Sequence, residues 1–123
     1  MGSSQIFDFV LIVMTLEKRF KTQLEGWNKY CNTLRVQISS NPNKVTKCPQ
    51  FKKLVQMGPE IIPSIRVAYN DRSLDRTIVL HGFPQLIREI VEGKFVIPEE
   101  YAGKMDKIEE YTIGWLDKYV FSL

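Results

Sequence analysis

Apolar residues recur at steps of three and four positions through the first third of the chain. Such steps place side chains on one face of a helix. Ser3 or Ser4 can cap its start, because a hydroxyl accepts hydrogen bonds from the free amides of a first turn. The pattern predicts a long N-terminal helix at about residues 5–35, with Gly26 marking a kink or a break. The apolar stripe consists of Phe9, Ile12, Val13, Leu16, Phe20, Leu24, Trp27, Tyr30 and Leu34.

The first turns of this helix are apolar on more than one face. Phe7, Val10, Leu11 and Met14 fall beside the main stripe. A helix that is apolar all round is buried on all sides. The segment therefore either runs through the centre of the domain or pairs its outer face with another chain. On the second alternative these four residues are the partner-binding site, and aromatic and Met side chains are common at such interfaces.

Shorter helices separated by turn residues follow. Ser, Asn and Pro residues make 38–47 a loop. A helix is predicted over 49–57, where Pro49 suits the first position because it has no amide to leave unpaired, and Gly58 is the stop. Pro59 opens the next helix, which carries Pro63 inside it.

The second half of the chain predicts three more helical stretches. Ser73 is the expected cap of a helix over 74–80, which His81-Gly82-Phe83-Pro84 should break. The helix resumes over 85–92, and residues 95–98 are extended. The last helix covers 103–120, and its apolar stripe consists of Met105, Ile108, Thr112, Trp115, Leu116 and Tyr119.

These elements predict an all-α fold, a compact bundle of about five or six helices in a single domain. The 123 residues are 44% hydrophobic and 11% aromatic, as in globular rather than disordered proteins. A domain of this length can bury a hydrophobic core large enough to fold without disulfide bonds. Cys31 and Cys48 therefore do not indicate a disulfide framework, and we expect a reducing, cytoplasmic setting.

The apolar run Phe9–Leu16 is too short to cross a membrane. Asp8 precedes it and Glu17 follows it, whereas a span needs about 20 apolar residues. The run also lacks the preceding positive charge and the cleavage site of a signal peptide. We expect no membrane partner.

A set of short motifs covers much of the chain: Leu24–Trp27, Ser39-Ser40, Cys48–Phe51, Met57–Pro63, Ile90–Gly93, Val96–Glu99, Gly103, Trp115-Leu116 and Tyr119. Their order and spacing resemble a family of small, uncharacterised bacterial helical proteins. Cys48 stands where that family usually has His, Tyr119 where it usually has Trp, and residues 73–84 are longer than usual. The resemblance implies an α-helical fold with a HEAT-like helical hairpin, and it implies no activity and no functional residues.

Charge is distributed unevenly along the chain. The net charge is +3, but residues 1–60 carry nine Lys/Arg and four Asp/Glu, whereas residues 61–123 carry eight and ten. The densest basic cluster is the candidate site for phosphate contacts, although such clusters are more often solvated faces. It consists of Lys44, Lys47, Lys52 and Lys53, and Arg66, Arg72 and Arg76 would extend it if the chain folded back.

The ionisable residues form no convincing reaction centre. His81 is the only histidine, no short metal-ligand spacing accompanies it, and a capping or surface position is expected for it. Neighbouring residues on a helix diverge, so neither Glu99-Glu100 nor Glu109-Glu110 converges on a substrate. We therefore predict no catalytic residues, no metal and no cofactor.

The function expected from the sequence is a non-catalytic protein-interaction module that binds a protein partner or a second copy of itself. The alternative is a nucleic-acid-associated protein that uses the lysine cluster. An enzyme is the third reading, and it would need a pocket that joins His81 to carboxylates.

Overall fold

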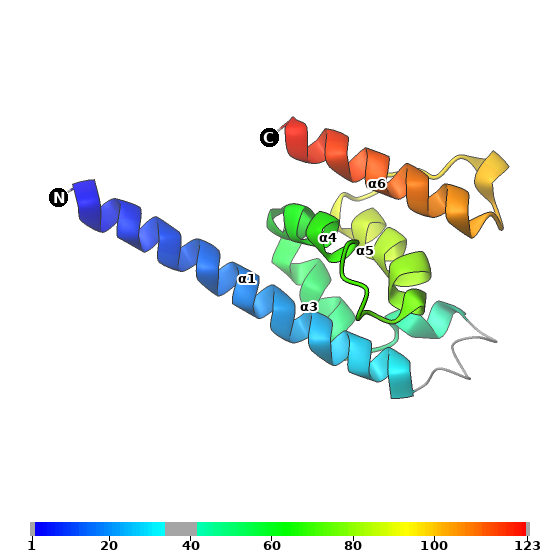
Figure 1. Cartoon of the computed structure of the whole chain (residues 1–123), viewed down its shortest axis with the longest axis horizontal. Coiled ribbons are helices and arrows are strands. Elements are labelled where there is room, and N and C mark those ends of the chain that lie inside the picture. The colour runs from blue at the N-terminus through cyan, green and yellow to red at the C-terminus, as the bar shows by residue number, and fades with distance from the viewer. Residues whose placement is uncertain (1, 34–41, 123) are drawn as a thin grey trace.

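The structure, a computed structural model, describes the backbone of residues 2–33 and 42–122 and the side chains of residues 15–33 and 43–122. Throughout these ranges the fold is all-α with no strand, as predicted. Figure 1 shows a long helix at one side, a group of short helices beside it and a second long helix across the group. The α-helices are α1 (Gly2–Thr33), α3 (Pro49–Met57), α4 (Ile62–Ala68), α5 (Phe83–Ile90) and α6 (Met105–Phe121), joined by short turns η1 (Pro42–Thr46), η2 (Gly58–Ile61), η3 (Ile78–Gly82) and η4 (Glu99–Tyr101).

The second half of α1 supplies the centre of the core. Trp27 is fully buried and its indole Nε1 donates to the carbonyl of Val45 at 2.7 Å. Its ring meets Phe51 and Phe83 edge-on, with ring centroids 5.5 and 6.0 Å apart. The helix continues through Gly26 without a break. A side chain there would press against Gln50 of α3, so the glycine serves close packing of two helices.

Helix α3 has the bounds that Pro49 and Gly58 predict. Gly58 takes the positive φ of 78° and its amide donates to the Val55 carbonyl. The next segment differs from the prediction, because Pro59 lies in the 3-10 turn η2 rather than in an α-helix. This turn places Pro63 in the first turn of α4, where a residue needs no amide for an intrahelical hydrogen bond.

The predicted break at His81–Pro84 is wrong. The chain passes from η3, a π-helical turn, directly into α5, and the Phe83 amide donates to the Ile78 carbonyl five residues earlier. A π turn shifts the hydrogen-bond register by one residue. Pro84 consequently falls in the first turn of α5, where no donor is needed.

The predicted cap at Ser73 is also replaced. The Ser73 amide and hydroxyl both donate to the Asp71 carboxylate, and Asp75 caps the helix by accepting from the Thr77 amide at 2.8 Å. The Asp75 amide itself donates to the side chain of Asn28 on α1, at 2.7 Å. This cap is therefore held in place by a distant helix.

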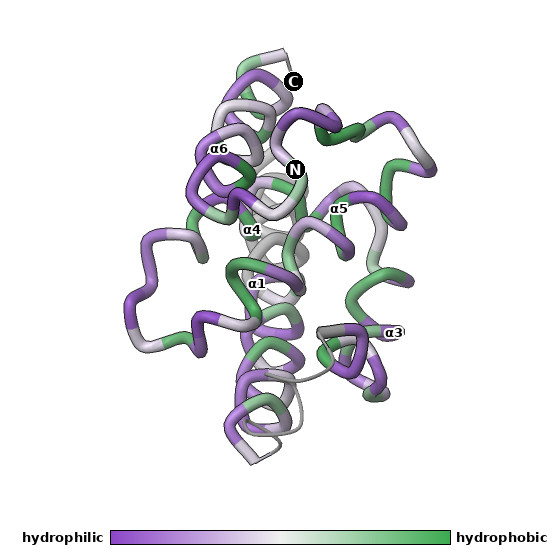
Figure 2. The backbone as a smooth tube through the Cα atoms, turned by 90° about the vertical axis from the view of Figure 1, so that its right-hand side faces the viewer, coloured by the Kyte–Doolittle hydropathy of each residue, from purple (hydrophilic) through white to green (hydrophobic). Residues whose placement is uncertain are grey.

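Helix α6 packs on α4 and η3. Two ion pairs fasten it: Arg66 with Asp117 at 2.6 Å, and Arg76 with Glu109 at 2.8 Å. Gly103, at a φ of 78°, precedes the helix, which starts at Met105 rather than at the predicted residue 103. Figure 2 shows polar and apolar residues alternating around the turns of α1 and α6, as expected of helices with one buried face.

Candidate functional site

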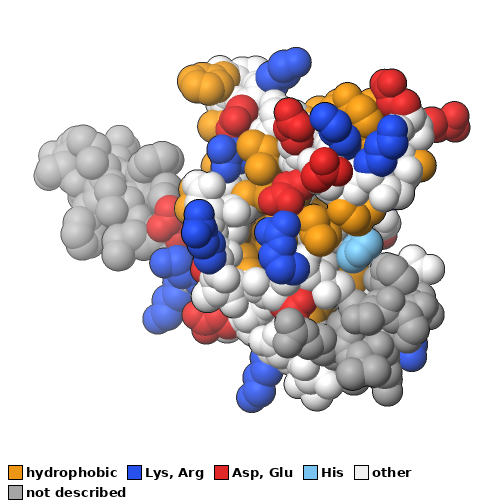
Figure 3. Space-filling view, turned by 45° about the vertical axis from the view of Figure 1, so that its right-hand side comes forward, with side chains coloured by type: hydrophobic (Ala, Val, Ile, Leu, Met, Phe, Trp, Pro, Cys, Tyr) orange, Lys and Arg blue, Asp and Glu red, His pale blue; other side chains and the backbone are white. Residues whose placement is uncertain are grey.

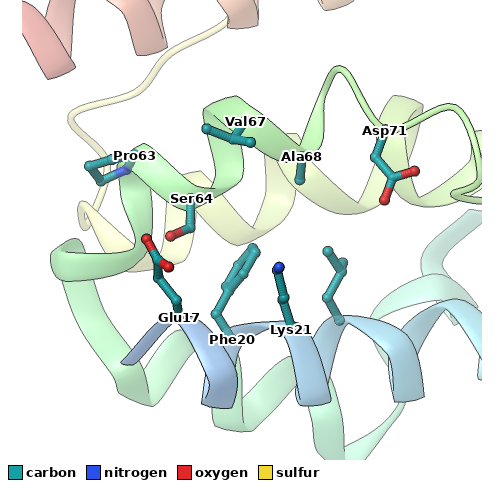
Figure 4. A pocket seen from close by; sticks show the side chains of 9 residues that line it. Glu17, Phe20, Lys21, Pro63, Ser64, Val67, Ala68 and Asp71 are labelled. Carbon is teal, nitrogen blue, oxygen red and sulfur yellow. The ribbon is translucent and has the colours of Figure 1, made fainter. Parts of the chain in front are cut away.

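A groove separates α1 from α4 on the surface of the molecule. It has a volume of about 330 Å³ and is lined by side chains of both helices, which Figure 4 shows facing each other across it. Its lining residues are Glu17, Phe20, Lys21 and Leu24 of α1, Pro63, Ser64, Val67 and Ala68 of α4, and Asp71 just beyond α4.

The groove has an apolar floor and charged ends. Phe20, Leu24 and Ala68 are almost completely buried and close its base. Val67 stands on the α4 rim with 69% of its surface exposed. Glu17 and Asp71 contribute carboxylates at the margin. An exposed apolar side chain beside an apolar groove is chemistry suited to a docked apolar surface.

The apolar pattern of the chain does not predict this groove. A signal was available: Ile61, Ile65 and Ala68 follow steps of four and three, whereas Val67 falls out of step with them. Residues out of step lie away from the core. The partner surface across the groove belongs to α1, which no local pattern in α4 can reveal.

The N-terminal half of α1 carries the predicted partner-binding residues. The helix backbone runs through positions 7, 10, 11 and 14, so Phe7, Val10, Leu11 and Met14 lie on a helix as predicted. Their side chains lie outside the described ones, so their role stays a prediction. In Figure 1 the backbone of this half extends past the ends of α3, α4 and α6.

The four lysines of the predicted cluster do not line one common hollow. Lys47 and Lys52 line a hollow between η1 and α3 that also contains the carboxylate of Glu89. Lys53 lines a different hollow, together with Arg19 of α1. Consecutive helix positions point about 100° apart, which explains the division. Lys44 is half-buried in η1.

The arginines that could have extended the cluster have other contacts. Arg66 and Arg76 form the two ion pairs with α6, and Arg72 is exposed beyond α4. Arg66 and Arg76 therefore neutralise carboxylates of α6 rather than extend the lysine cluster. Among the residues whose side chains are described, these lysines and arginines give no continuous basic stripe of the kind that follows a nucleic-acid backbone.

His81 is half-buried in the middle of a continuous helical segment. Of the two positions expected for it, the cap at a helix end is wrong, whereas the surface position agrees with its partial exposure. Burial lowers the pKa of its imidazole from the ordinary value of 6.5, because desolvation disfavours the cation. Figure 3 shows its side chain at the surface beside apolar residues. Within the described ranges, no three His, Cys, Asp or Glu side chains are grouped closely enough to hold a metal ion.

Cys31 and Cys48 are buried and free. Burial raises the pKa of Cys31 to about 12, with smaller contributions from Asp75 and Cys48. Burial also raises the pKa of Cys48, and this effect outweighs hydrogen bonds from the backbone amides of Phe51 and Gln50, which lower the pKa. Both thiols are therefore protonated near neutral pH, a state that suits packing rather than nucleophilic attack.

An aromatic cluster lies where α6 packs against the edge of the core. Phe95 is buried beneath it, with ring centroids 5.9 Å from Tyr111 and 5.1 Å from Trp115. Trp115 in turn stacks on Tyr119 at 5.3 Å. The Tyr111 hydroxyl donates to the Val96 carbonyl at 2.8 Å and ties the chain before η4 to the helix. The cluster therefore joins α6 to the segment that precedes it.

Comparison with known proteins found no matching family model, no matching curated protein and no matching solved structure. The resemblance to bacterial helical proteins, with its HEAT-like hairpin, accordingly stays a prediction. In the part of the chain that is described, none of the helices combines the length and the apolar character needed to cross a bilayer. Inference about function therefore rests on the geometry of the sites above.

Proposed function

We propose that this chain is a non-catalytic protein-interaction module that self-associates through the N-terminal half of α1. The observation that carries the proposal is the length of α1 relative to the bundle. The helix has 32 residues, which corresponds to about 48 Å. The core residues from its described part are Phe20, Leu24, Trp27 and Cys31, all in the second half, while the backbone of the first half extends beyond the short helices (Figure 1).

The amino acids of that first half support an interface. Residues 6–16 contain nine apolar residues, Asp8 and Thr15. An isolated helical segment of this length is only marginally stable in water, because nucleation is unfavourable. Burying an apolar side chain contributes about 1.5–3 kcal/mol. Pairing with another chain would therefore stabilise both the helix and the association.

The titratable groups of the described residues support a role without catalysis. The cysteine thiols are protonated, and burial favours neutral His81. Arg66 and Arg76 are held in ion pairs. A catalytic site needs a nucleophile or base with activated chemistry beside a binding pocket. The groove between α1 and α4 has an apolar floor and offers a surface for docking instead.

Light scattering of the intact chain across the micromolar range tests the proposal. We expect a dimer, and we expect Phe7→Asp and Val10→Asp to shift it toward the monomer, because a buried unpaired carboxylate is costly. Two differently tagged copies provide a second readout: the intact chain should capture its partner copy, and a chain truncated before Leu16 should not. A monomeric intact chain that captures no second copy would contradict the proposal.

A further inference from the structure

The hollow between α1 and α3, called the basic hollow below, is lined mainly by polar side chains of both helices. Arg19 and Gln23 lie one turn apart on α1, and Lys53, Gln56 and Met57 come from the last two turns of α3. Its volume is about 380 Å³, within the range of small-molecule sites, roughly 300–1,000 Å³. The basic hollow therefore has room for a ligand larger than a single ion.

The packing of α1 on α3 determines which side chains meet there. The two helices come closest where Gly26 of α1 lies against Gln50 of α3, since a Cβ atom on the glycine would be 3.0 Å from the Gln50 side chain. Arg19 and Gln23 precede Gly26 by steps of four and three, and Lys53 follows Gln50 by a step of three. Residues at these steps share a helix face. The helices therefore run antiparallel and bring the two sets of side chains to one hollow.

The polar side chains of the basic hollow have no partner within the part of the chain whose side chains are described. No hydrogen bond or ion pair there engages Arg19, Gln23, Lys53 or Gln56. The two arginines that contact α6 are, by contrast, both held in ion pairs. Donors from two helices thus border one hollow with their hydrogen-bonding capacity available to a ligand.

The charge on the lining of the basic hollow is entirely positive. Arg19 and Lys53 contribute two positive charges, and the described lining contains no Asp or Glu. Glu17 of α1 lines the groove on the other flank of the helix, beside α4. Glu25 and Glu60 are exposed and lie outside the lining. Like charges beside one hollow repel each other, and a bound anion relieves this repulsion.

We propose that the basic hollow binds the phosphate monoester group of a small phosphorylated molecule. Such a group carries a charge of about −1.5 to −2 near neutral pH and three acceptor oxygens, which matches two cations better than a singly charged carboxylate does. The planar guanidinium of Arg19 can donate to two phosphate oxygens at once, and Lys53 adds a point charge. The glutamine amides can donate to the remaining oxygen. Both helices belong to one chain, so the site is complete without self-association.

Two adjacent lysines of α3 form a matched pair for testing this site. Lys53 lines the basic hollow, whereas Lys52 lines the hollow that includes the carboxylate of Glu89. Both lysines are exposed, and replacing either by Gln removes one positive charge. The change in overall charge is therefore the same in the two variants, but only Lys53→Gln removes a proposed phosphate contact. Gln56 borders both hollows and does not discriminate between them.

Titration of the full chain with phenyl phosphate, followed by amide NMR signals at constant low ionic strength, tests the site. We expect saturable binding with the largest signal shifts around Gln23 and Lys53. Lys53→Gln and Arg19→Gln should each raise the dissociation constant roughly fivefold or more, because each removes a charge-assisted hydrogen bond. Lys52→Gln should raise it by less than about twofold, through the change in overall charge alone.

Two further probes identify the ligand class. Benzoate has the same ring and a single negative charge, so we expect it to bind more weakly than phenyl phosphate. Inorganic phosphate should also bind more weakly, because it fills only part of the hollow. Equal binding of benzoate would overturn the assignment to a phosphate group, and equal binding of inorganic phosphate would overturn the assignment to a larger molecule.

The remaining outcomes concern the place of binding. Equal weakening by Lys52→Gln and Lys53→Gln would show attraction by overall charge and overturn the site. Arg19 and Lys53 are exposed, so their variants should keep the circular dichroism and thermal unfolding of the intact chain. The signal map of the intact chain needs no variant, and shifts that leave out Gln23 and Lys53 would overturn the proposal by themselves. A single-stranded oligonucleotide that binds more tightly than phenyl phosphate and depends on Lys52 but not on Lys53 would also overturn it.

Discussion

The two long helices of the bundle are attached in different ways. In the described part of α1, Trp27 and Cys31 are fully buried, and the helix is held by core packing and the hydrogen bond from Trp27 to Val45. In α6, Thr112 and Leu116 are the fully buried residues, and half-buried aromatic residues packed against the edge of the core, together with ion pairs, complete the attachment. Disturbing α1 should therefore threaten the whole fold, whereas disturbing α6 should be tolerated.

The largest difference is expected between the two tryptophans. Trp27→Ala should lower the free energy of unfolding by about 3–5 kcal/mol, because it removes a fully buried ring and leaves a cavity. Trp115→Ala on α6 should lower it by clearly less, because that ring is half-buried. Denaturant unfolding measures both. An equal or larger loss for Trp115→Ala would show that α6 is as central to the core as α1.

Two glycines sharpen the same comparison. A Cβ atom at Gly82 would lie 2.5 Å from Cζ2 of the Trp27 ring, so Gly82→Ala should destabilise by about 1–3 kcal/mol through overpacking. Gly114 of α6 has no atom within 4 Å of the corresponding position. Gly114→Ala should therefore stabilise by about 0.5–1 kcal/mol, the usual preference for alanine inside a helix. Thermal unfolding of both variants checks the opposite signs, and equal signs would refute the packing argument.

The ion pair between Arg66 and Asp117 should make a small contribution. Both side chains are partly exposed, so a double-mutant cycle with Arg66→Ala and Asp117→Ala should give a coupling free energy of about 0.2–1 kcal/mol. The coupling should shrink in high salt, because solvent ions screen partly exposed charges. A coupling that salt leaves unchanged would indicate that the pair is buried more deeply than its exposure suggests.

The smallest effect concerns His81 in η3, the turn that packs on α6 and whose Gly82 faces Trp27. Because burial lowers the pKa of folded His81 below 6.5, the unfolded chain binds a proton first as pH falls. Stability should decrease below pH 6.5 until the folded-state pKa is passed, and then level off. Urea unfolding at a series of pH values measures this slope. His81→Gln should remove the part of the pH dependence of the unfolding free energy that His81 causes. If the variant has the same slope as the intact chain, groups other than His81 cause the pH dependence.

Local signals predicted much of the fold. Pro49 and Gly58 define both ends of α3 because their backbone constraints act within a residue or two. The break expected at His81–Pro84 failed because Ile78, Phe83 and Leu86 are all buried, and packing keeps the segment helical through a π turn. The cap moved from Ser73 to Asp75 for a similar reason, since Asn28 holds the Asp75 amide from another helix.

Local sequence patterns are a weaker guide to surface sites than to helices. Of four lysines that are close in sequence, Lys47 and Lys52 line one hollow, Lys53 lines another and Lys44 lines neither, because Lys52 and Lys53 point to different sides of α3. The groove was missed because its walls are Phe20 and Lys21 on one helix and Val67 on another. Proximity in the chain is therefore a poor guide to proximity on the surface of a helical bundle.

By itself, the sequence determined that this chain is helical and that its N-terminal helix is apolar beyond the needs of a single face, because helical periodicity is a local property written in steps of three and four residues. Tertiary structure alone decided which helices meet: it set Trp27 against Gly82, joined Arg66 to Asp117 and opened a groove between α1 and α4. These contacts join residues far apart in the chain, and their geometry follows from the packing of whole helices against one another.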